Sequence, residues 1–148
     1  SMTKKHMPKI LSVMVPFPYS ITSNAALTDA EAMMKQHNIH HLPVVDNEDI
    51  IGIISARDLL KAVSLGHKLD DIDGLEVGDL VTHRAYMVDI NDPLSEVLTS
   101  MVDNHIGSAI VLREGDIAGI FTAIDALHHH IQLLQSVFNP DTPDDLIA

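Results

Sequence analysis

The chain has 148 residues and a mass of 16.2 kDa, and 9 Lys and Arg against 21 Asp and Glu give it a formal net charge of −12. This acidic field repels polyanions, which disfavours a nucleic-acid partner, and the absence of Cys excludes disulfides, thiolate zinc sites and cysteine catalysis. No apolar run approaches the ~20 residues of a membrane span, so we expect a soluble, cytoplasmic protein with no membrane partner.

The first half of the chain predicts five elements, in the order turn, strand, helix, hairpin and helix. Apolar residues recur at helical spacing (Leu27, Ala30, Met33 and Met34), and two β-branched runs separated by polar residues are typical of a hairpin. A closing helix begins after Ser55, and Gly66 stands where it would end. The predicted turn, strand and hairpin strands are 10–14, 19–22, 42–45 and 50–54.

The second half of the chain predicts the same elements in the same order. Asp92 is expected to cap the first helix, with Pro93 at its first position. Glu114 and Gly115 provide a hairpin turn, and a closing helix begins after Thr122 and continues to about residue 137. The predicted turn, strand and hairpin strands are 77–81, 86–90, 109–112 and 117–121.

Direct alignment of the two halves shows an internal repeat. Residues 19–60 align with 86–127 without a gap, and 13 of the 42 pairs are identical, where ordinary composition gives about two or three. Each unit is therefore β-α-β-β-α, and the chain is an α/β (α+β) fold of two tandem copies. The predicted boundaries are 8–66 for the first repeat, 67–76 for an Asp-rich linker, 77–137 for the second repeat and 138–148 for an acidic tail.

Motifs in both repeats resemble the CBS-domain family. The first repeat has Leu42-Pro43-Val44-Val45-Asp46 and then Gly52-Ile53-Ile54-Ser55-Ala56-Arg57-Asp58, and the second has Gly119-Ile120-Phe121-Thr122-Ala123-Ile124-Asp125. Met34 and Met101 lie where the family keeps a helix methionine. The second repeat departs from the pattern, because Ala109-Ile110-Val111-Leu112-Arg113 lacks the Leu-Pro pair and the acidic residue. The resemblance covers about residues 8–130 and identifies the chain as a stand-alone CBS-domain pair, or Bateman module.

This resemblance implies a pseudo-twofold module with two clefts between the repeats, which in many members bind AMP, ADP, ATP or S-adenosylmethionine. The residue types suit such ligands. A carboxylate accepts charge-assisted hydrogen bonds from both ribose hydroxyls, a helix N-terminus offers N–H groups to phosphate, and apolar strand residues form a wall for adenine. The implied function is regulatory: an adenine-nucleotide sensor that acts through conformational change or association with a partner, with no enzyme activity and no catalytic cofactor.

Transfer of the family pattern, position by position, gives two unequal clefts. Two of the three arginines fall in cleft one, where Ile124 and Phe17 are their counterparts in cleft two, so cleft one is expected to prefer phosphate. Protonation of His40 or His41 is expected to raise the nucleotide affinity of cleft two as pH falls toward about 6. Cleft one comprises Ile53, Ser55, Arg57, Asp58, Val81, Arg84, Tyr86, Gly107 and Ser108. Cleft two comprises Met14, Phe17, Tyr19, His40, His41, Ile120, Thr122 and Asp125.

Simpler roles would account for the same residues. Asp58 and Asp125 could serve only as helix caps, the arginines could be solvated surface charges, and the clefts could stay empty in a module that only mediates protein interaction. Consecutive histidines such as 128–130 point about 100° apart on a helix, so no metal site is predicted. Ser55 and Thr122 have no evident base, so nucleophilic catalysis is not predicted either.

The final helix predicts a second copy of the chain as a partner. Ile131, Leu134 and Val137 would form an apolar face that a single module leaves in contact with water. The resemblance implies pairing as a homodimer through helix faces, and such a face can be covered by its own copy across a twofold axis, so a homodimer is expected. The protein that would be regulated cannot be named from these residues.

Overall fold

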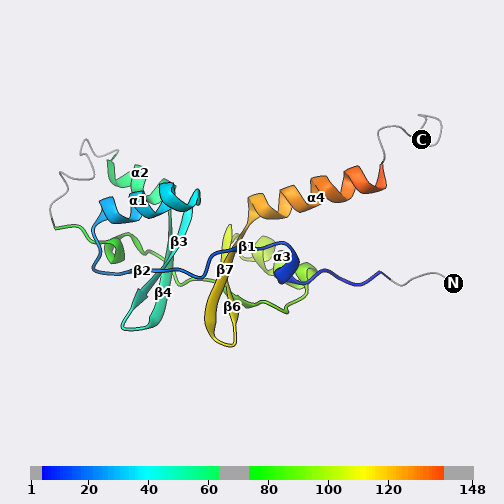
Figure 1. The fold of residues 1–148 in the computed structure, drawn as a ribbon, viewed down its shortest axis with the longest axis horizontal. Helices are drawn as coiled ribbons and strands as arrows, with labels where there is room; N and C mark the ends of the chain where they lie inside the picture. The colour runs from blue at the N-terminus through cyan, green and yellow to red at the C-terminus, as the bar shows by residue number, and fades with distance from the viewer. Residues whose placement is uncertain (1–4, 64–73, 139–148) are drawn as a thin grey trace.

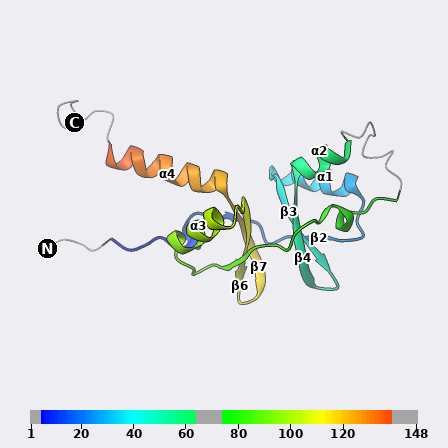
Figure 2. The same cartoon turned by 180° about the vertical axis from the view of Figure 1, so that it is seen from behind.

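The computed structural model describes residues 5–63 and 74–138, which form two small sheets with their helices, side by side (Figures 1 and 2). Two single-turn 3₁₀ helices are present where turns were predicted. The elements of the first half are η1 (Ile10–Ser12), β1 (Val15–Pro16), β2 (Ile21–Thr22), α1 (Leu27–His37), β3 (His41–Asp46), β4 (Asp49–Ser55) and α2 (Ala56–Val63). Those of the second half are η3 (Val77–Leu80), β5 (Met87–Asp89), α3 (Leu94–Asp103), β6 (Ser108–Arg113), β7 (Asp116–Thr122) and α4 (Ala123–Val137).

The first sheet has the strand order β2-β3-β4, with β2 parallel to β3 and β3 antiparallel to β4. The hairpin turn places Asn47 and Glu48 at positive φ (47° and 71°), the conformation that matches a two-residue turn to strand twist. Leu42, Val44 and Ile54 are completely buried on the face that packs against α1 and α2. The predicted hairpin is confirmed, extended by one residue at each end.

The second sheet has the order β1-β7-β6-β5 and repeats the hairpin, with Glu114 and Gly115 at φ 50° and 85°. One predicted detail is wrong. Asp92 does not cap α3, because its Oδ2 accepts a hydrogen bond from the Asp89 N–H (2.9 Å) in the preceding turn. Pro93 is then the residue before the helix, and it makes no side-chain cap.

The opening turn of each repeat packs against the other repeat. The Ile10 N–H donates to the Asp92 carbonyl (3.1 Å), and Ile10 is fully buried in the second core. In the same way, the Val77 N–H donates to the Ala25 carbonyl (2.9 Å), and Val77 is fully buried in the first core. Strand β1 completes the exchange, because it joins the sheet of the second repeat and pairs antiparallel with β7. The two repeats therefore form one interlocked unit.

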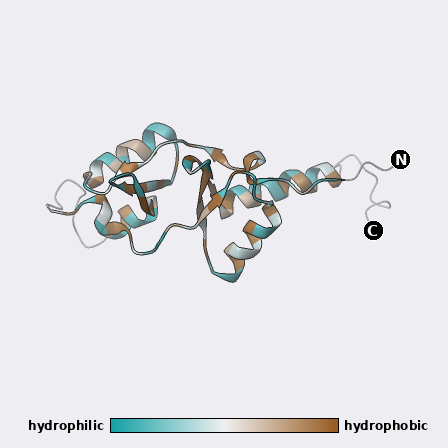
Figure 3. Cartoon of the chain, turned by 90° about the horizontal axis from the view of Figure 1, so that it is seen from below, coloured by the Kyte–Doolittle hydropathy of each residue, from teal (hydrophilic) through white to brown (hydrophobic). Residues whose placement is uncertain are grey.

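The two closing helices differ in how they pack. In α2, Leu59 and Ala62 are buried against the first core, whereas α4 has no buried residue and extends away from both sheets (Figure 1). Figure 3 shows hydrophobic residues along this projecting helix. Within residues 5–63 and 74–138, no helix is long and apolar enough to cross a membrane. The predictions for Gly66, most of the linker and nearly all of the acidic tail lie outside the described residues.

Candidate ligand-binding clefts

A cavity of about 480 Å³ opens between the repeats, at the position predicted for cleft one. Its floor comes from β4 and the first turn of α2, and its sides come from the segment before β5 and the loop between α3 and β6. Six of the nine residues predicted for cleft one line this cavity: Ile53, Asp58, Arg84, Tyr86, Gly107 and Ser108. Ser55, Arg57 and Val81 are not among the lining residues.

The carboxylate of Asp58 is held by the end of its own helix. The Ser55 N–H and Oγ–H both donate to Asp58 Oδ2 (2.7 and 3.0 Å), and the Asp58 N–H donates to Ser55 Oγ (3.2 Å). This capping box fixes the side chain through one oxygen. A carboxylate carries a second oxygen with its own lone pairs, so the capping role and a ligand-binding role are compatible.

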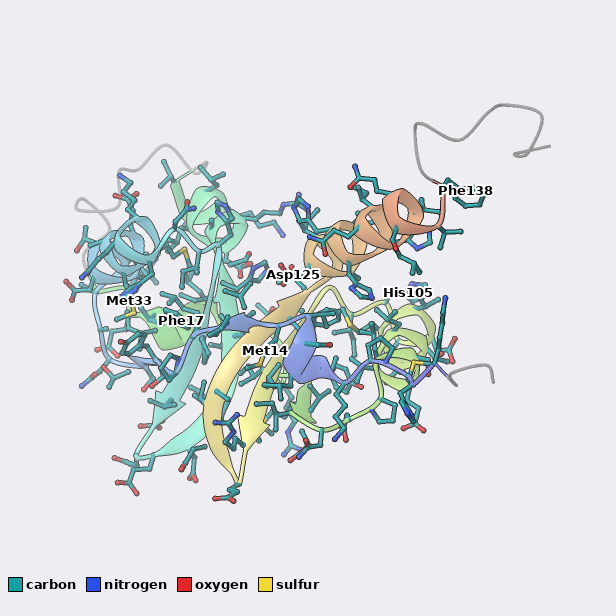
Figure 4. All side chains as sticks on the ribbon, turned by 45° about the vertical axis from the view of Figure 1, so that its right-hand side comes forward. Met14, Phe17, Met33, His105, Asp125 and Phe138 are labelled. Atoms are coloured by element: carbon teal, nitrogen blue, oxygen red, sulfur yellow. The ribbon has the colours of Figure 1, made fainter. Side chains whose placement is uncertain are left out.

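The same arrangement recurs in the second repeat. The Thr122 N–H and Oγ1–H donate to Asp125 Oδ2 (2.8 and 3.0 Å), and the Asp125 N–H donates to Thr122 Oγ1 (3.3 Å). Asp125 lies at the base of α4, on the side of the first repeat (Figure 4). The two carboxylates are thus presented alike, and any functional difference between the clefts must come from the surrounding residues.

Five further residues line cleft one that the sequence analysis did not single out: Thr82, His83, Asn104, His105 and Ile106. They lie on the same two segments as Arg84 and Gly107. A helix–strand loop contributes consecutive residues to a cleft, so the whole loop could have been included. His83, next to Arg84 in the chain, and His105, on the loop between α3 and β6, add two imidazoles to the lining of the cavity.

Cleft two is built from the counterparts of the segments that form cleft one. Here the opening segment and the sheet strand, β1 and β7, lie closer together. Strand β1 is hydrogen-bonded to β7, with Val15 opposite Ile120 and Pro16 opposite Gly119. A Cβ at Gly119 would stand 2.5 Å from the Val15 carbonyl oxygen, so glycine is needed for this approach. In cleft one, β4 is an edge strand, and a Cβ at Gly52 would instead meet the side chain of Val81.

His41 is within electrostatic reach of both capped carboxylates. It stands opposite Ser55 in the β3–β4 ladder, and both Asp58 and Asp125 act on its charge. Burial of the ring, with a smaller contribution from His40, lowers the pKa of His41 below 6.5 despite the two carboxylates. The gain of charge on His41 near pH 6, expected from its sequence, is therefore displaced to lower pH.

The two arginines predicted for cleft one differ in their positions. Arg57 is exposed on the first turn of α2, whereas Arg84 borders both cleft one and a second groove lined by Glu48 and Asp49.

Among the described residues, no group of three or more His, Cys, Asp or Glu side chains is arranged to hold a metal ion.

The CBS-domain family model matches residues 10–65 and 77–131, which together cover most of the chain, one match within each repeat. The chain belongs to the CBS-domain family. The family assignment and the fold of two tandem repeats are thereby confirmed. CBS-domain pairs are generally regulatory rather than catalytic.

Several relatives have this chain's overall organisation. Hypoxic response protein 1 of Mycobacterium tuberculosis is 27% identical over 127 residues, spanning 81% of this chain and 87% of that protein. The CBS domain of a bacterial CNNM/CorC family Mg²⁺ transporter, solved with ATP, is 26% identical with a TM-score of 0.68, covering 83% of this chain and 87% of that one. A CBS domain pair solved with 5′-methylthioadenosine and S-adenosyl-L-methionine has a TM-score of 0.72 at 22% identity, covering 86% of this chain and 99% of that one, and shows the shared fold.

Proposed function

We propose that this CBS-domain pair is a regulatory sensor of an adenine nucleotide of the AMP, ADP or ATP type, which binds in cleft one. The observation that carries the proposal is the cavity of about 480 Å³ in which Asp58, Tyr86 and Arg84 meet. That volume is within the usual range for a small-molecule site. The ATP complex of the transporter's CBS domain supports the same class of ligand.

Each part of a nucleotide has a matching group in this cavity. The Asp58 carboxylate accepts hydrogen bonds from ribose hydroxyls, Ile53 and Ile106 provide apolar surface for adenine, and Arg84 pairs with phosphate. His83 and His105 add further nitrogen groups to the lining of the same cavity. On a chain of net charge −12, a phosphate needs such a local cluster to overcome the repulsion of the remaining surface.

Titration calorimetry tests the phosphate assignment. The wild-type chain is titrated with AMP, ADP, ATP, adenosine and S-adenosylmethionine, and the phosphorylated ligands should bind more tightly than adenosine. The Arg57→Ala/Arg84→Ala variant should lose about tenfold or more in AMP affinity while its adenosine affinity changes little. Added salt should weaken AMP binding in the wild type.

Arg113→Ala is the control, because it removes the one remaining arginine of the chain, at the exposed end of β6 and outside the cavity lining. It should bind AMP like the wild type. If the double variant binds AMP and adenosine just as the wild type does, the arginines are not phosphate ligands and the cleft assignment is wrong. If none of the five compounds binds, the alternative function holds, an interaction module whose clefts stay empty.

We also propose that the sensor works as a homodimer that contacts its copy through α4. Leu127, Ile131 and Leu134 recur at helical spacing on this helix and are 58%, 49% and 42% exposed. An apolar groove of about 330 Å³ lies between α1 and α2, and Leu60, on its rim, is 68% exposed. Contact between copies would remove these surfaces from water and give the nucleotide signal a route to a partner protein.

A further inference from the structure

Three rings of the chain itself come together where cleft two is expected. Phe17, Tyr19 and His37 form what we term the aromatic cluster. Its ring centroids are 5.2 Å apart for Phe17–Tyr19, 5.4 Å for Phe17–His37 and 5.1 Å for Tyr19–His37. The two pairs that involve Phe17 are edge-to-face, at 73° and 76°, an attractive geometry for aromatic rings.

The aromatic cluster occupies the repeat positions that line the cavity of cleft one. Its three residues are the counterparts of residues that face open space in the first cleft. The pairs are Phe17 with Arg84, Tyr19 with Tyr86 and His37 with Asn104. The same backbone positions therefore form an open cavity in one cleft and a packed group of rings in the other.

The wall behind the aromatic cluster is buried too. Ile120 is the counterpart of Ile53, which lines cleft one, yet Ile120 is only 3% exposed and shares a buried core with Phe17, itself 3% exposed. The Phe17 N–H donates to the Ala118 carbonyl (3.1 Å), next to the paired strands β1 and β7. Figure 4 shows Phe17, directly after β1, between the labelled side chains of Met14 and Met33. The backbone thus fixes Phe17 beside β7, in the same buried core as Ile120.

We propose that each chain takes one adenosine-type ligand, in cleft one, and that the aromatic cluster closes cleft two to it. The stoichiometry rests on the proposed function of cleft one, whereas the closure does not. Entry into cleft two would require Phe17 to leave its buried position, which corresponds to at least about a tenfold loss of affinity. Phe17 is thus a specificity-determining residue, placed where the open cleft has Arg84.

Stoichiometry is the first test. Titration of the full chain with AMP should give one site per chain, and Asp58→Ala should weaken that site while Asp125→Ala leaves it unchanged. Two sites of similar affinity per chain would overturn closure and leave the proposed function intact. Absence of any AMP binding would overturn the proposed function, and closure is then decided by the second test, which needs no ligand.

Thiol labelling is the second test, made clean by the absence of cysteine from the chain. Ile53→Cys and Ile120→Cys each introduce a single thiol at matched positions of the two clefts. With a maleimide dye of about nucleotide size, the thiol in cleft one should react at least about tenfold faster. Adding Tyr19→Ala and His37→Ala should accelerate labelling at position 120 only. Equal rates in the two single variants would overturn closure.

A second matched pair keeps the test decisive if Ile120→Cys does not fold, as judged by circular dichroism. Ser108→Cys and His41→Cys are counterparts at the first residues of β6 and β3, and both side chains are partly buried. Ser108 lines the open cavity, so its thiol should again react faster. Faster labelling at position 41 would overturn closure.

Discussion

The two repeats place the same elements in the same order, yet their closing helices and clefts differ. In the first repeat, α2 packs Leu59 and Ala62 into the core, whereas α4 of the second repeat buries none of its residues. Conversely, the cleft that contains Asp58 is open, whereas at the matched positions of the other repeat Phe17, Tyr19 and His37 pack together, and Asp125 borders a smaller hollow of about 210 Å³ beside α4. The repeat therefore sets the order of helices and strands. Individual side chains determine which helix and which cleft are available to partners.

The largest expected effect is a change in oligomeric state, and it concerns α4, the closing helix that buries no residue. Light scattering should give a mass of twice 16.2 kDa for the wild type, and Ile131→Glu/Leu134→Glu should reduce it to that of one chain. A charge placed in the α4 contact would have to be buried without a partner. Met87→Glu, which changes an exposed residue of β5, should remain dimeric. A wild-type mass of 16.2 kDa across micromolar concentrations would show that α4 is not a dimer contact.

The second prediction separates the two capped carboxylates. Asp58→Ala and Asp125→Ala should each lower the free energy of unfolding by about 0.5–2 kcal/mol, because each removes one capping box. Only Asp58→Ala should also weaken AMP binding, by about 1.5–3 kcal/mol, since it removes a charged acceptor. Denaturation and calorimetry on both variants measure the two effects independently. Equal AMP affinity in wild type and Asp58→Ala would mean that the carboxylate is only a helix cap.

The third prediction compares Gly52 of β4 with Gly119 of β7. At each glycine, a segment of the other repeat comes close to the strand. Gly119→Ala should lower the free energy of unfolding by about 1–3 kcal/mol, because the added Cβ meets the Val15 carbonyl oxygen and the Met14 sulfur. Gly52→Ala should cost less, because its closest contact is a side-chain atom of Val81, and the nearest backbone atom, the His83 carbonyl oxygen, is farther away at 3.2 Å. Urea denaturation of the two variants checks the order. The reverse order would show that β1 is held less firmly than the segment that contains Val81.

The smallest effect is a pH dependence from His41. Its pKa is lowered in the folded chain, so the unfolded chain binds the proton more readily. The contribution of His41 to stability is therefore complete above pH 6.5 and declines as pH falls below that value. His41→Ser, which copies Ser108, should make stability fall less steeply between about pH 7.5 and about pH 5. An unchanged slope in His41→Ser would contradict the assignment.

The sequence alone determined the repeat, the element order and the capping residues. These features depend on short-range rules: the period of apolar residues, the turn preference of Glu114-Gly115, and the reach of Asp58 back to Ser55 three positions earlier. The exception, the predicted cap at Asp92, failed because a second short-range partner, the Asp89 N–H, takes the same carboxylate.

The tertiary structure alone decided how the two repeats exchange their opening turns. Ile10 and Val77 occupy matched positions of the repeat, and only packing shows that each is buried in the core of the other repeat. Tertiary packing also places Phe17 and Ile120 in one buried core, lowers the pKa of His41 through burial, and leaves Arg84 beside an open cavity. Such outcomes depend on contacts between residues far apart in the chain. The volume of the side chains at those contacts determines which cleft stays open, and the local sequence pattern does not.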